Sequence, residues 1–85
     1  ASGSSLNSLS STMTIKEGRV GIGTEVPNSG ALLELSSTTQ ALILPRMNTT
    51  NRDAISGENG MIIYNISTNK VDVFCNGSWE QVTSS

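Results

Sequence analysis

Residues 71–82, VDVFCNGSWEQV, carry the clearest structural signal in the chain. Apolar and polar side chains alternate at residues 71–73, which is the period of a half-buried strand, and Phe74 and Cys75 continue the run. Asn76 and Gly77 both tolerate the positive φ angles of a two-residue hairpin turn, and residues 78–82 resemble a returning strand. The sequence therefore predicts an antiparallel hairpin here.

The residues before this hairpin extend the pattern. Residues 61–64, MIIY, predict another strand, and a turn at residues 67–69 would make the last third of the chain a three-strand meander. Residues 48–55 begin with Asn and Thr, which cap helices, and stop before Gly57. They predict one short helix of about two turns.

Strands are also predicted in the first half of the chain. Residues 31–35 and 41–44 are short apolar runs, the second stopped by Pro45. Residues 13–23 alternate around Gly18 and predict a hairpin, in which Gly21 and Gly23 indicate a bulge or a closely passing backbone. The fold class expected is mainly β, a small antiparallel domain with one short helix.

The start of the chain differs in composition. Residues 1–14 contain six Ser and two Thr, which predicts a flexible linker, and residues 15–85 are expected to form one β-rich domain. We also expect the chain to be part of a longer protein.

Composition limits the function. The net charge of −2, with five Lys and Arg, argues against nucleic-acid binding, which needs a basic stripe. The chain has no His and one Cys, so we expect no catalytic residue, no cofactor and no metal site. No run approaches the ~20 apolar residues of a membrane span, so no membrane insertion is expected.

Several predicted strands are apolar on both faces. Residues 32–33, 42–44 and 61–63 would each need cover on two sides, and one short helix cannot provide it. Identical chains sharing one core would supply the missing surface. A compact monomeric barrel or sandwich is the alternative.

Three segments in order resemble a known family. They are GRVGIGTEVP followed by ALLEL (residues 18–35), ALILPRMNTTNRDAI (41–55), and NGMIIYN with NGSW (59–65 and 76–79). This pattern is similar to C-terminal tip or collar domains of phage and virus tail-fibre proteins. The resemblance implies a non-enzymatic homotrimer at the virion surface that shares its core, follows a fibre shaft and holds three chains in register. It also implies a host glycan or protein receptor as partner, and a crowded threefold region at residues 21–23.

Apolar residues of the predicted strands are the candidates for the trimer core. They are Val20, Ile22, Leu33, Leu35, Leu42, Ile43, Leu44, Ile62 and Ile63.

Tyr64 and Trp79 are candidates for stacking on a receptor glycan. A lone Trp contributes more as buried area, however, which favours Trp79 as a hairpin anchor.

The seven carboxylates are interpreted as almost all solvated, with Arg46 or Arg52 pairing Asp53 near the helix. The alternative function is a monomeric carbohydrate-binding module attached to a larger protein.

Overall fold

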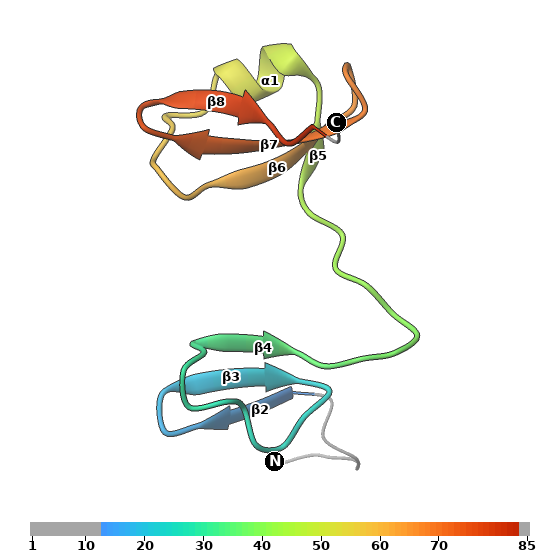
Figure 1. Ribbon diagram of the computed structural model, residues 1–85, viewed down its shortest axis with the longest axis vertical. Helices are drawn as coiled ribbons and strands as arrows, with labels where there is room; N and C mark the ends of the chain where they lie inside the picture. Colours follow the sequence, from blue (N-terminus) through green and yellow to red (C-terminus); the bar gives the residue numbers. More distant parts are fainter. Residues whose placement is uncertain (1–12, 84–85) are drawn as a thin grey trace. The chain divides into compact units, whose positions relative to one another are not determined.

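The computed structural model describes residues 13–83, which form two compact units divided between Leu42 and Ile43 (Figure 1). Unit 1 comprises the described residues up to Leu42, and unit 2 those from Ile43. The fold is mainly β, with two small sheets and one short helix, as the sequence predicted. A single domain from residue 15 was expected; the chain instead divides in two.

Unit 1 is a three-stranded sheet in the order β2-β3-β4. Strands β2 (Met13–Lys16) and β3 (Arg19–Ile22) form the predicted antiparallel hairpin, with positive φ at Glu17 and Gly18 in its turn. Strand β2 includes the last two residues of the predicted linker, and the rest of that linker lies outside the described residues.

The third strand of unit 1 departs from the expected antiparallel arrangement. Strand β4 (Leu33–Leu35) pairs with β3 in parallel, with Val20 opposite Leu33. The chain reaches this register because residues 23–32 loop back to the start of β3 before β4 begins. That loop contains the turn signal around Pro27 and Asn28, where the Ala31 amide donates to the Asn28 carbonyl at 3.0 Å.

Unit 2 is a four-stranded sheet in the order β5-β6-β7-β8. Its strands are β5 (Arg46–Met47), β6 (Ile62–Asn65), β7 (Lys70–Cys75) and β8 (Ser78–Gln81). The predicted meander β6-β7-β8 is confirmed, and its second hairpin turns through positive φ at Asn76 and Gly77. Strand β5 pairs in parallel with the edge of β6 that faces away from β7.

The predicted helix is confirmed as α1 (Thr49–Asp53). Its N-cap is Asn48, whose side-chain oxygen accepts from the Asn51 amide at 2.8 Å. In Figure 1, α1 lies over one face of the unit 2 sheet.

The prediction of a strand at residues 41–44 was wrong. These residues have no regular secondary structure, and β5 begins only after Pro45. Apolar composition favours a strand, but a strand also needs a neighbouring ladder for its backbone groups, and no described strand pairs with this segment.

Gly23 is held in a conformation that excludes side chains. Its φ is +86°, and a Cβ there would overlap the backbone carbonyl of Ser36, which continues from β4. The Ser36 amide donates to the Ile22 carbonyl at 2.8 Å, so the Ser36 backbone cannot move away without breaking the parallel pairing. The close approach predicted at this glycine therefore occurs within one chain.

Substitution of Gly23 tests this packing. Gly23→Ala is expected to lower the free energy of unfolding by roughly 3 kcal/mol, because backbone strain and a steric overlap add. Gly18→Ala is the matched control, since Gly18 has φ +81° with nothing within 4 Å, and it should cost only about 1 kcal/mol. Urea unfolding at one fixed chain concentration measures both, and equal costs would contradict the proposed overlap.

Candidate functional site

One face of the unit 1 sheet is entirely apolar. Residues opposite one another on paired strands point to the same side of a sheet, and the register aligns alternate residues of β2, β3 and β4. The side chains on this side, termed the open face of unit 1, are Met13, Ile15, Val20, Ile22, Leu33 and Leu35.

The chain covers the other side of this sheet instead. Pro27 is buried, and a Cβ on Gly21 would lie 2.8 Å from its ring. The Asn28 amide donates to Glu34 Oε1 at 2.7 Å, which holds the same loop over β4. The open face of unit 1 has no comparable cover: five of its six side chains are exposed, from 37% at Ile22 to 74% at Ile15, and Val20 on the middle strand is half-buried. A contiguous exposed apolar face of this kind marks an interaction surface.

Unit 2 has a similar but mixed face. The side of the sheet opposite α1, termed the open face of unit 2, carries Ile62, Tyr64, Val71, Val73 and Cys75. Ile62 is exposed and the other four are half-buried. The register also places three polar or charged side chains on this side, those of Arg46, Ser78 and Glu80. Burial, followed by the nearby Glu80 carboxylate, raises the pKa of the Cys75 thiol, so at neutral pH it stays protonated and unreactive.

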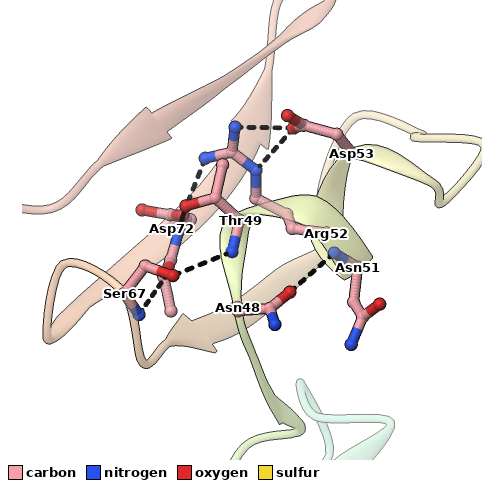
Figure 2. A network of polar contacts seen from close by, with 8 residues as sticks. Asn48, Thr49, Asn51, Arg52, Asp53, Ser67 and Asp72 are labelled. Atoms are coloured by element: carbon pink, nitrogen blue, oxygen red, sulfur yellow. Dashed lines mark hydrogen bonds and ion pairs between the residues drawn. The ribbon is translucent and has the colours of Figure 1, made fainter.

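The face under α1 holds a polar network (Figure 2). Asp72 is fully buried, and its Oδ2 accepts from Arg52 Nη1 at 2.9 Å and from Asn65 Nδ2 at 3.0 Å. Asn65 is also fully buried, and the same amide nitrogen donates to Thr49 Oγ1 at 3.0 Å. The network therefore ties both ends of α1 to the middle strands of the sheet.

This network corrects the interpretation of the acidic residues. Asp72 is not a solvated surface charge but the buried acceptor for Arg52. The predicted pair with Asp53 also forms, at 2.7 Å, and uses Arg52 rather than Arg46. Asp53, and after it Asp72, raise the pKa of the Arg52 guanidinium above its ordinary value, so its contribution to stability is lost only under strongly alkaline conditions.

Arg52 also positions Trp79. Its guanidinium carbon lies 5.6 Å from the centroid of the Trp79 ring, and Phe74 meets the same ring edge-on at a centroid distance of 5.1 Å. Trp79 thus packs as the anchor of the β7-β8 hairpin. Tyr64 lies on the opposite side of the sheet, because it pairs with Val71 while Trp79 pairs with Phe74. The structure does not bring the two glycan candidates together.

The candidates for the trimer core separate into four places. Val20, Ile22, Leu33 and Leu35 lie on the open face of unit 1. Leu42, Ile43 and Leu44 lie in the segment without regular structure, and Ile62 lies on the open face of unit 2. Ile63 is 4% exposed and is the one large apolar side chain buried among residues 13–83, so its own chain already covers it.

The Arg52–Asp72–Asn65 network was missed at the sequence level. Its signal is the presence of Asn65 and Asp72 at inward positions of otherwise apolar strands, with an Arg on the preceding helix. Residues 13–83 contain no cluster of three or more Asp, Glu, Cys or His able to hold a metal ion, and no helix long and apolar enough to cross a membrane.

The fold and the open faces define a small β domain built for self-association. The chain belongs to a family described as the phage tail like trimerisation region, whose model matches residues 21–85. No curated protein and no solved structure matched the chain. The resemblance to phage fibre domains is therefore confirmed, and the chain is a trimerising component of a phage tail-like protein.

Removing one partner of the buried ion pair tests the network. Arg52→Met is expected to lower the free energy of unfolding by about 3 kcal/mol or more, because Asp72 would remain buried without its cation. Arg19→Met is the matched control, since the Arg19–Glu17 pair has an exposed carboxylate (69%) and should be worth less than about 1 kcal/mol. Chemical unfolding measures both variants.

The double variant Arg52→Met/Asp72→Leu extends this test. It should recover part of the loss, because no uncompensated charge is left in the interior. If the double variant loses as much stability as Arg52→Met and Asp72→Leu lose when their separate effects are added, the assigned pairing is contradicted.

Proposed function

We propose that the chain trimerises through the open face of unit 1 and so holds three fibre chains in register. The observation that carries this proposal is the placement of six apolar side chains on one uncovered side of the sheet, with the chain's own loop on the other. Each such side chain contributes on the order of 1 kcal/mol when it is removed from water. The family description names trimerisation, so the proposed partners are a second and a third copy of the same chain.

The proposed site of action is the surface of a phage particle, on a tail or fibre appendage. A tip made of three identical domains presents each weak contact three times, which raises avidity without any new contact. We therefore include attachment to a host glycan or protein receptor in the proposal, and the domain acts by association, not by catalysis. Membership of a phage tail-like trimerisation family supports this location.

The alternative of a monomeric carbohydrate-binding module is less well supported. An aromatic platform for a sugar needs rings on one accessible surface. Tyr64 and Trp79 lie on opposite sides of their sheet, and Trp79 is already in contact with Arg52 and Phe74.

A single charge on the open face separates a trimer from a monomer. Ile15→Asp would be tolerated in a monomer, because Ile15 is 74% exposed there, but should dissociate a trimer that buries it. Lys16→Asp is the matched control: Lys16 follows Ile15 on β2, points to the other side and changes the charge by more. Light scattering at micromolar concentration gives the mass, and a trimeric Ile15→Asp variant would refute the placement of the interface.

Binding to host cells tests the attachment part. The trimer should bind a glycan array or susceptible cells with an apparent affinity at least ~100-fold above that of the dissociated Ile15→Asp variant, through multivalency alone. No binding by either form would remove receptor attachment from the function while leaving trimerisation in place. Equal binding by both forms would refute the multivalent gain in affinity.

A further inference from the structure

The segment Ala41-Leu42-Ile43-Leu44 lies outside both sheets. Leu42 is 61% exposed and Ile43 is 70% exposed, although both are strongly apolar. Among the described residues, none forms a hydrogen bond to the backbone of residues 41–44. Four consecutive apolar residues with free backbone donors and acceptors are suited to pairing with another chain.

Hydrogen bonds lie on either side of this segment. Before it, Ser37 Oγ closes a local turn by accepting from the Thr39 and Gln40 amides at 3.1 and 2.9 Å. After it, the Pro45 carbonyl accepts from the Tyr64 amide at 2.9 Å, which starts the pairing of β5 with β6. The gap in backbone pairing is therefore confined to the residues between these two contacts.

Its start is continuous with the open face of unit 1. Ala41 and Leu42 line a depression of about 580 Å³ together with Ile22 and Leu35, the last residues of β3 and β4 on that face. An occupant of the open face would therefore also meet the beginning of this segment.

A strand over this segment would have no polar face. In an extended chain, Leu42 and Leu44 point to one side and Ala41 and Ile43 to the other, so both sides are apolar. The backbone donors and acceptors point along the two edges between these sides, and around a threefold axis each edge can meet a different neighbouring copy. Residues 35–45 contain no charged side chain, so three identical copies can approach here without like-charge repulsion.

We propose that residues 41–44 form an intersubunit strand, which becomes ordered by pairing with the same segment of the neighbouring copies close to the threefold axis. This inference rests on the proposed trimer and names the part of the chain that lies nearest its axis. The proposal explains why this segment has the composition of a strand without being one in the single chain: the strand with which it pairs belongs to another copy.

Cysteine cross-linking of the full chain tests the proposal. In a Cys75→Ser background, Ile43→Cys should give disulfide-linked pairs under mild oxidation, because a disulfide forms only when two Cα atoms approach within about 7 Å. Thr68→Cys, in the exposed turn between β6 and β7, is the control and should cross-link at least ~10-fold more slowly. Equal rates at the two positions in a trimer would overturn the proposal.

Two further measurements separate the possible failures. Light scattering on the unmodified chain comes first, and a monomer would overturn both the proposed function and this inference. Hydrogen exchange of the unmodified trimer comes second and does not depend on any variant folding. The amides of residues 42–44 should exchange at least ~100-fold more slowly than in a free peptide. Exchange at the free-peptide rate in an intact trimer would overturn the intersubunit strand alone.

Discussion

Each unit of this protein can cover only one side of its sheet with its own chain. In unit 1 the loop around Pro27 fills one side, and in unit 2 helix α1 does so. The other side is apolar in unit 1 and largely apolar in unit 2, and Ile15 and Ile62 are exposed on these sides. Because apolar side chains stabilise a fold only when they leave water, we propose that other copies supply the missing cover. Membership of a trimerisation family agrees with this need for cover from other copies.

The two units depend on association to different degrees. Unit 2 contains buried Ile63 and the Asp72–Arg52 ion pair, so part of its stability lies within one chain. In unit 1 the buried described residues are Gly21 and Pro27, neither of which contributes a large apolar side chain. Its loop contacts specify the shape of the sheet, whereas in the proposed trimer Ile15 and its neighbours are buried by another copy. The proposal therefore couples the folding of unit 1 to assembly.

Local signals explain which predictions succeeded. The β2-β3 and β7-β8 hairpins were predicted because Gly18, Asn76 and Gly77 accept positive φ, and the helix because Asn48 caps it. Residues 41–44 were misassigned because composition reports the preference for a strand and not the presence of a partner. The parallel pairings of β4 and β5 depend on contacts between distant residues and had no local signal. The burial of Asp72 had only its position within an apolar strand as a signal.

The amino-acid sequence by itself determined the class of the protein: a mainly β, charge-poor domain with more apolar strand surface than one chain can cover. It also determined the turns, because the ability to adopt a positive φ angle depends on the type of the single residue at that position. Tertiary structure alone decided which side of each sheet is open, since a shift of one residue in register exchanges the two sides. For the same reason it alone placed Tyr64 and Trp79 on opposite sides and brought Arg52 to Asp72.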